Sequence, residues 1–164
     1  MEANALFRST PATLRLMIFA GLLVGTLDIA AAFISFYLTT GRNPLILLKA
    51  IASALLGPSA LTGGGGMLLL GLALHFLIAG SFTVLFFWAY PRLALAGKNR
   101  VLIGVAYGLF IWMVMTMLVL PLSRLPAQPF SLSAAAREVG ILVAMIGLPL
   151  AFLAARHFGA QRQE

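Results

Sequence analysis

The sequence contains no cysteine and few charged residues, and each shortage excludes a class of protein. Without cysteine, the chain can form neither a disulfide framework nor a cysteine metal site. Only 9% of its 164 residues are charged, whereas soluble domains carry about 25%. Four of the charged residues are acidic and 11 are basic, and the chain has two histidines. A soluble globular domain is therefore excluded.

Long apolar stretches stand where a soluble protein would carry charges. Hydrophobic residues make up 62% of the chain, and its mean hydropathy is +1.04. A helix of about 20 apolar residues crosses the hydrocarbon core of a bilayer. Four stretches reach this length, at about residues 16–38, 67–89, 101–121 and 134–155. The sequence thus predicts an all-α fold, a membrane-embedded four-helix bundle in which residues 1–164 form a single transmembrane domain.

The first stretch admits a second interpretation, a cleaved signal peptide. Arg8 and Arg15 precede the apolar run, and Ala30-Ala31-Ala32 offers small residues of the kind found at cleavage sites. The run nevertheless continues past these alanines to Tyr37, and Asp28 places a charge within it. Both features favour a membrane span.

A shorter apolar segment, at about residues 44–56, lies between the first and second spans. It is too short to cross a bilayer, so the sequence predicts an interfacial helix. Lys49 and Ser53 are one turn apart, and we expect them to face water together. The four glycines Gly63–Gly66 then predict a flexible hinge. They do not predict a phosphate-binding loop, because the Lys-Ser/Thr ending of such a loop is missing.

Prolines and serines mark the ends and bends of the last two spans. Pro121 ends the third span, and Ser131 or Ser133 can cap the start of the fourth. Pro149 lies inside the fourth span, where the loss of a helical hydrogen bond predicts a kink.

Basic residues are spread over the connections and predict how the chain is threaded. With the N-terminus inside, seven Lys and Arg fall on the inner side and four on the outer side. The inner set is Arg8, Arg15, Arg92, Lys98, Arg100, Arg156 and Arg162, and the outer set is Arg42, Lys49, Arg124 and Arg137. Because cytoplasmic loops carry the excess of positive charge, we expect both termini in the cytoplasm. No basic stripe with interleaved aromatics occurs, so we expect the lipid bilayer, not nucleic acid, as the partner of these charges.

Small residues recur four positions apart in three of the spans, which is typical of closely packed membrane helices. The pairs are Gly21 and Gly25, Gly104 and Gly108, and Gly140 and Ala144. We expect them at helix contacts, either within the chain or with a second copy or another membrane protein.

Asp28 and His75 are the two residues that packing explains least. Counted along helices, Asp28 lies about 18 Å from the inner boundary and His75 about 12 Å from the outer one. In a core of about 30 Å both therefore lie at one level, with Thr116 within about one turn of it. Two interpretations remain open. One is a hydrogen bond that fixes helix register, and the other is a proton-labile pair or ligand site lining a polar cavity.

The remaining polar residues do not predict an enzyme. Zinc sites usually need three protein ligands, and the second histidine, His157, lies in the tail, so we expect no metal and no cofactor. An aspartyl mechanism would need a second carboxyl group near Asp28, and the sequence has none there. Gly57-Pro58-Ser59 is only a faint match to an intramembrane serine motif. We therefore expect no catalytic residue.

Several short motifs together resemble a set of small bacterial integral membrane proteins with no assigned activity. The resemblance covers about Gly21 to Ala155, and it rests on Gly25-Thr26-Leu27-Asp28, Leu55-Leu56-Gly57, Gly71-Leu72-Ala73-Leu74-His75-Phe76, Tyr107-Gly108 and Pro121-Leu122-Ser123. It implies an uncharacterised four-span protein of the bacterial inner membrane and carries over no site residues.

These observations lead to two hypotheses about function. The first is a non-enzymatic membrane protein for proton-linked small-solute transport or sensing, through Asp28 and His75. The alternative is a structural or assembly subunit of a membrane complex, held by the glycine faces. A lipid-modifying enzyme is a third class, for which no nucleophile or metal site can be named.

Overall fold

The computed structural model describes residues 11–125 and 131–160, and the regular structure in these ranges is entirely helical. Four helical segments are long and apolar enough to cross a membrane: Thr13–Thr40, Gly65–Arg92, Arg100–Leu122 and Leu132–Gly159. The predicted all-α fold with four spans is confirmed. The chain is a multi-pass membrane protein.

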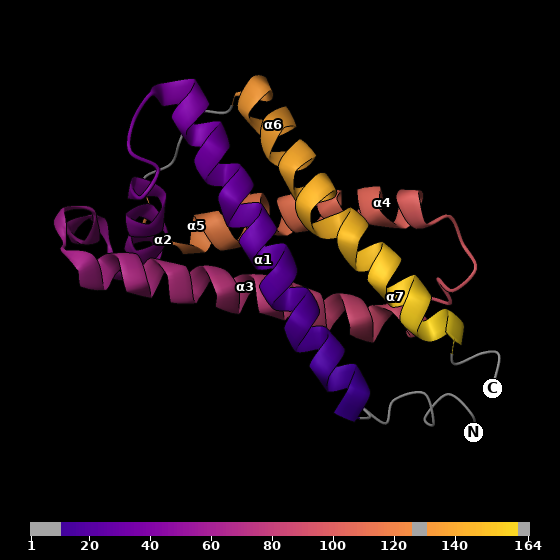
Figure 1. Cartoon of the computed structure of the whole chain (residues 1–164). Helices are drawn as coiled ribbons and strands as arrows, with labels where there is room; N and C mark the ends of the chain where they lie inside the picture. The colour runs from indigo at the N-terminus through magenta and orange to yellow at the C-terminus, as the bar shows by residue number, and fades with distance from the viewer. Residues whose placement is uncertain (1–10, 126–130, 161–164) are drawn as a thin grey trace.

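The first two spans are continuous helices, α1 (Pro11–Thr40) and α3 (Gly65–Arg92), which lie across each other (Figure 1). At 1.5 Å per residue they are about 45 and 42 Å long, enough to cross the headgroup regions as well. Both extend beyond the predicted 16–38 and 67–89, because helical hydrogen bonding continues where hydropathy falls. At the crossing, a Cβ on Gly21 would lie 3.5 Å from the Cα of Gly80.

The predicted short helix between these spans is α2 (Ile46–Leu56), followed by a 3-10 turn at Pro58–Thr62. It packs so closely on α3 that a Cβ on Gly71 would overlap the backbone oxygen of Leu48. The expectation that Ser53 faces water is wrong, because Ser53 is fully buried. Its hydroxyl donates to the Ala50 carbonyl at 2.7 Å, so burial leaves no polar group unsatisfied.

The third and fourth spans each contain a π-helical turn. The third span is α4 (Arg100–Val114), a π turn (Met115–Val119) and α5 (Leu120–Leu122). The fourth is α6 (Leu132–Leu142), a π turn (Val143–Gly147) and α7 (Leu148–Ala160). Each π turn lies just before a proline, Pro121 or Pro149, which cannot donate to the carbonyl four residues earlier. The kink predicted at Pro149 therefore takes the form of a widened turn.

Polar groups at the helix ends explain where the last two spans begin. The Asn99 side chain accepts from Val101 and Leu102 at the start of α4, and Ser131 accepts from Ala134 at the start of α6. The choice left open between Ser131 and Ser133 thus falls on Ser131.

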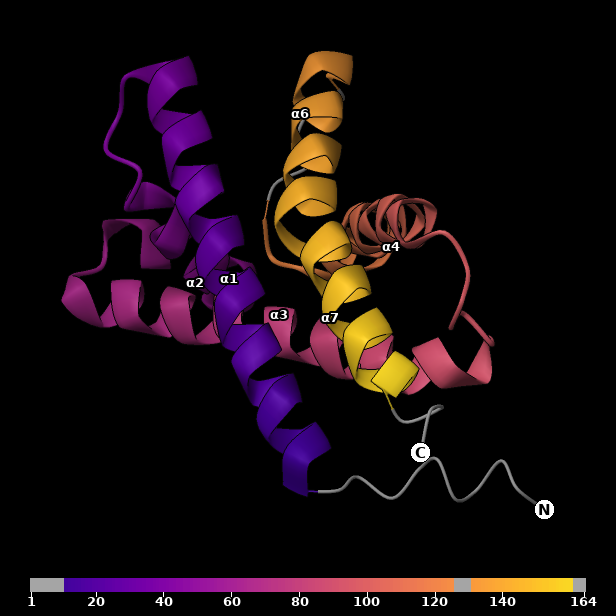
Figure 2. The ribbon, with the colours of Figure 1, turned by 45° about the vertical axis from the view of Figure 1, so that its right-hand side comes forward.

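The fourth span packs on the third and also contacts α1 and α3 (Figure 2). The buried core lies among α3, α4 and α7, around Phe87, Tyr90, Ile111 and Leu150. Tyr90 stacks on Phe158 with ring centroids 5.5 Å apart. This core joins the end of α3 to the end of α7 and also includes Ala20 and Val24 of α1.

Candidate functional site

A cavity of about 520 Å³ lies among the four spans and α2. Its walls are mostly aliphatic, and three polar side chains reach it: Asp28 from α1, His75 from α3 and Ser123 after α5. The apolar walls include Ile51 and Leu55 of α2, Ile78 and Phe82 of α3, Met115 and Leu118 of the third span, and Leu142 and Ile146 of the fourth. All four spans and α2 thus line one partly open cavity.

Asp28 and His75 line this cavity together, but the hydrogen bond of His75 goes elsewhere. The imidazole Nε2 lies 2.8 Å from the backbone oxygen of Gly25, one turn before Asp28. Because a carbonyl only accepts, Nε2 carries the hydrogen. The described residues form no hydrogen bond or ion pair between Asp28 and His75, although the two side chains interact electrostatically. The bond to Gly25 fixes α3 against α1 at this level.

The carboxyl group of Asp28 has no hydrogen-bond or ion-pair partner in the part of the chain that the structure describes. It faces a cavity whose walls offer mainly hydrocarbon. An ionised carboxylate costs a few kcal/mol in such surroundings unless it is protonated or paired. The site therefore suits a bound proton or a ligand with a positive or hydrogen-donating group.

Two hydroxyl residues near the cavity differ from expectation. Thr116 lies in the π turn of the third span and is not among the residues that line the cavity. Ser123, which sequence reasoning missed, does line it, but its hydroxyl donates to the Leu120 carbonyl at 2.7 Å. Next to Ser123, the amide of Arg124 donates to the Ala54 carbonyl at 2.9 Å and so ties the end of the third span to α2.

Both π turns contribute to the cavity wall, the first through Met115, Leu118 and Val119 and the second through Ile146. A sequence signal for them exists. Met117–Leu122 and Met145–Leu150 share the pattern Met-x-x-Leu-Pro-Leu. In each, a proline removes one helical hydrogen bond at the level of the cavity. Turns of this kind occur frequently at functional sites.

Glycines hold the spans around the cavity at short range. A Cβ on Gly25 would lie 2.9 Å from the Phe76 ring, and one on Gly108 would lie 2.7 Å from the Cα of Val143. Gly104 faces Leu148 of α7 in the same way. Gly140, which we expected at a helix contact, faces open space with nothing within 4 Å. Gly147 instead makes the close contact, because the π turn rotates the part of the helix that follows it.

His157 lies away from the cavity, where its Nε2 is 3.1 Å from the Thr13 hydroxyl. It thus connects the end of α7 to the start of α1. Within the described ranges, no three His, Cys, Asp or Glu side chains gather closely enough to hold a metal ion.

Comparison of the chain with protein-family models, curated proteins and solved structures found no match. Function must therefore be argued from the chemistry of the cavity.

Proposed function

We propose that the protein binds a small solute in this cavity and couples its binding to proton exchange at Asp28 and His75. The single observation that carries the proposal is the Asp28 carboxyl group, which has no hydrogen-bond or ion-pair partner among the described residues and faces a cavity lined by every span. A membrane-embedded acid in this situation is a functional site by default. A proton and a cationic solute can each neutralise it, and they compete for the same oxygen atoms.

His75 is suited to assist this exchange. Its Nε2–H is held by the Gly25 carbonyl, so Nδ1 is the ring atom that gains or loses a proton. The ring stays anchored to α1 in both states.

The size and walls of the cavity define the solute class. About 520 Å³ falls within the range of small-molecule sites, which is about 300–1,000 Å³. The walls favour an apolar body, and Asp28 favours one positive or proton-donating group. The π turns at Pro121 and Pro149 give the third and fourth spans points at which to bend as solute enters.

We further propose a bacterial inner-membrane location with both termini in the cytoplasm. The basic residues support this threading, because Arg15, Arg92, Arg100 and Arg156 lie toward the helix ends that would face the cytoplasm and Lys98 lies in the connection between α3 and α4. Arg8 and Arg162, which were counted with them, lie outside the described residues.

Solute flux in vesicles tests the proposal. The full chain is reconstituted, a pH gradient is imposed, and uptake of the organic cation ethidium is followed by fluorescence. We expect gradient-driven uptake that Asp28→Asn reduces to the level of protein-free vesicles. Glu138→Gln is the matched control, since Glu138 is the other described acid and lies outside the cavity.

A second readout does not depend on the choice of solute. Infrared difference spectra between acidic and alkaline buffer should contain the carboxylic-acid C=O band of Asp28, absent in Asp28→Asn and kept in Glu138→Gln. Identical spectra for the wild type and Asp28→Asn would show that Asp28 exchanges no proton, and the proposal would fail.

A second candidate function, an assembly subunit, is favoured by a different observation. Helix α6 buries none of its residues, and three small residues of the fourth span are at the surface: Ala136 and Gly140 of α6 and Ala144 of the π turn that follows. Such residues allow another helix to approach closely.

A further inference from the structure

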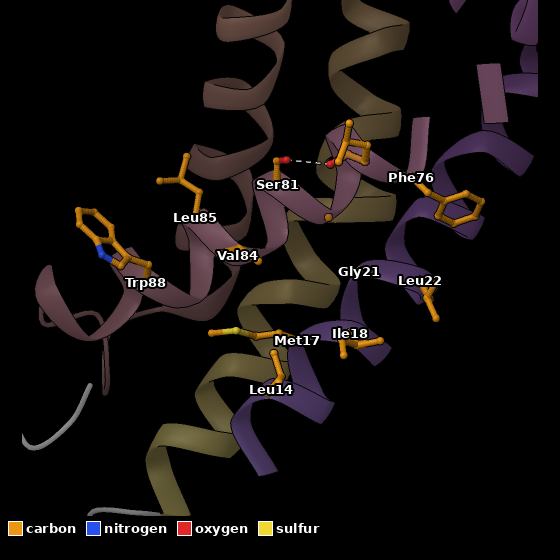
Figure 3. Close-up of a pocket in the computed structure, with 12 residues that line it drawn as sticks. Leu14, Met17, Ile18, Gly21, Leu22, Phe76, Ser81, Val84, Leu85 and Trp88 are labelled. Carbon is orange, nitrogen blue, oxygen red and sulfur yellow. Dashed lines mark hydrogen bonds between the residues drawn. The ribbon is translucent and has the colours of Figure 1, made fainter. Parts of the chain in front are cut away.

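A second hollow, separate from the Asp28 cavity, runs along the surface between α1 and α3. It has a volume of about 750 Å³ and shares no lining residue with the cavity. The two helices meet near Gly21 and Gly80 and separate toward Leu14 and Trp88. Figure 3 shows Leu14, Met17 and Ile18 of α1 on one side and Val84, Leu85 and Trp88 of α3 on the other. We call this hollow the α1–α3 groove.

The α1–α3 groove is apolar along its length. Its aliphatic walls are well exposed, with Ile18 at 56% and Leu77 at 65%. Ser81 is its one hydroxyl residue, and that hydroxyl donates to the Leu77 carbonyl at 2.8 Å (Figure 3). Between the helix crossing and Trp88, no side chain that lines the groove therefore demands a polar ligand, so the occupant must itself be apolar there.

The groove also has the length of one bilayer leaflet. Along α1 it extends from Leu14 to Leu22, about 12 Å, and along α3 from Phe76 to Trp88, about 18 Å. Half of the hydrocarbon core is about 15 Å thick. A lipid acyl chain that begins at the Trp88 end would thus reach the crossing of the two helices.

Positive charge is concentrated at the Trp88 end. The Arg92 guanidinium lies 4.0 Å from the centroid of the Trp88 ring, and its Nη1 donates to the Trp88 carbonyl at 3.0 Å. Arg15 follows the groove residue Leu14 directly. The two described acids, Asp28 and Glu138, lie far along their helices from this end. An anionic headgroup is the complement of this charge.

We propose that the α1–α3 groove binds an anionic phospholipid, with one acyl chain between the helices and the phosphate at Arg15 and Arg92. A second copy of the chain fits less well. In a membrane, a two-fold axis along the bilayer normal brings identical ends together. It would place the same arginines of both copies side by side with no described acid between them.

The chain offers a direct reporter, because it has two tryptophans and one of them, Trp88, lines the groove. Trp112→Phe leaves Trp88 as the only source of tryptophan fluorescence. This protein is reconstituted in phosphatidylcholine, and a rising fraction of a brominated lipid is added, either brominated phosphatidylglycerol or brominated phosphatidylcholine. The bromine atoms on the acyl chains quench tryptophan on contact. We expect brominated phosphatidylglycerol to reach half-maximal quenching at a several-fold lower fraction than brominated phosphatidylcholine.

Charge variants separate a local site from general surface charge. Arg92→Gln should raise the half-quenching fraction of brominated phosphatidylglycerol about fivefold, the effect of one cation at an anionic surface. Arg92→Lys, which keeps the charge, should stay near the parent value. Arg100→Gln is the matched control, since Arg100 lies at the same end of the bundle but, unlike Arg92, makes no described contact with the groove residue Trp88. Each variant is compared with its own fluorescence in unbrominated lipid.

Filling variants test the acyl-chain position. No atom lies within 4 Å of a Cβ built on Gly80, so a side chain begins in open space there, and Gly80→Leu should extend into the groove. Ser81→Leu enlarges a second side chain that lines the groove. Both should lower quenching by brominated phosphatidylglycerol, whereas Ala73→Leu, at an exposed position of α3 outside the groove, should not. Circular dichroism identifies a filling variant that is misfolded. In that case the quenching of the other filling variant tests the acyl-chain position.

The proposal is overturned by any of three results. Equal quenching by the two brominated lipids would mean ordinary bilayer contact without headgroup selection. Equal effects of Arg92→Gln and Arg100→Gln would mean diffuse attraction to the basic end. If brominated lipid does not quench Trp88 in the Trp112→Phe parent, and Ser81→Cys cross-links two copies of the chain, then a second copy occupies the groove.

Discussion

At the scale of single residues, counting along helices could anticipate which side chains face one cavity, but it could not predict their hydrogen-bond partners. Counting along helices placed Asp28 and His75 at one depth, and both line one cavity. The partner of His75 is the carbonyl of Gly25, a group that every residue carries. Which carbonyl is chosen depends on how the two helices are rotated about their axes. Because these helices are apolar on all sides, their hydropathy pattern does not predict how they are rotated about their axes.

The hydrogen bond from His75 to Gly25 leads to a prediction about stability and flux. His75→Ala removes the bond and some packing, and should lower the free energy of unfolding by about 0.6–1.7 kcal/mol. His75→Gln keeps an N–H that can reach the Gly25 carbonyl, so it should lose less stability, but it cannot take up a proton.

Unfolding in mixed detergent with rising denaturant measures the stability of both variants, and gradient-driven ethidium uptake measures their flux. We expect His75→Gln to be stable and impaired in uptake. Equal destabilisation by the two substitutions would mean that packing of the ring, not the bond to Gly25, holds α3 against α1.

At the scale of helices, the sequence patterns predicted which helices form, but they did not predict the π turns in the third and fourth spans. The pair Gly104 and Gly108 was expected at a helix contact, and both lie against the fourth span. The face of the fourth span that meets them includes Gly147 in place of Gly140. The π turn at Val143–Gly147 is wider than an α turn, so spacing counted from Gly140 no longer applies beyond it. The proline that causes this turn was visible, but its effect on the packing face was not.

The two glycines of the fourth span provide a matched pair of substitutions. A Cβ on Gly147 would overlap the backbone oxygen of Gly104, and neither backbone can move aside without separating the third and fourth spans. Gly147→Ala should therefore cost about 1–3 kcal/mol of unfolding free energy. Gly140→Ala meets open space and should be neutral or stabilise the helix by up to about 1 kcal/mol.

Denaturant unfolding followed by circular dichroism, at low protein concentration in detergent, distinguishes the two variants. A Gly147→Ala protein as stable as the parent would show that the third and fourth spans are not in the tight contact described above.

At the scale of the whole molecule, composition was enough to predict four spans, because each apolar stretch has the length that a bilayer demands. It was not enough to predict that the spans cross and converge on an aromatic core at one end. Tilt is set by side-chain packing, here by residues such as Tyr90 and Phe158, which are distant in sequence. The separation of α1 from α3 beyond their crossing leaves the α1–α3 groove open, and α6 has no buried residue.

The exposed face of α6 leads to a prediction about assembly. Ala136, Gly140 and Ala144 are exposed on this helix, so a second helix can approach its backbone closely. Because the chain has no native cysteine, Ala136→Cys yields a protein with a single thiol. If two copies meet at this face, the thiols oxidise to a disulfide that is visible as a dimer on a denaturing gel. Gly140→Leu in the same protein should suppress the dimer by holding the helices apart. Ala73→Cys on the exposed side of α3 is the control, and dimers formed equally by both cysteines would indicate random collision in the membrane.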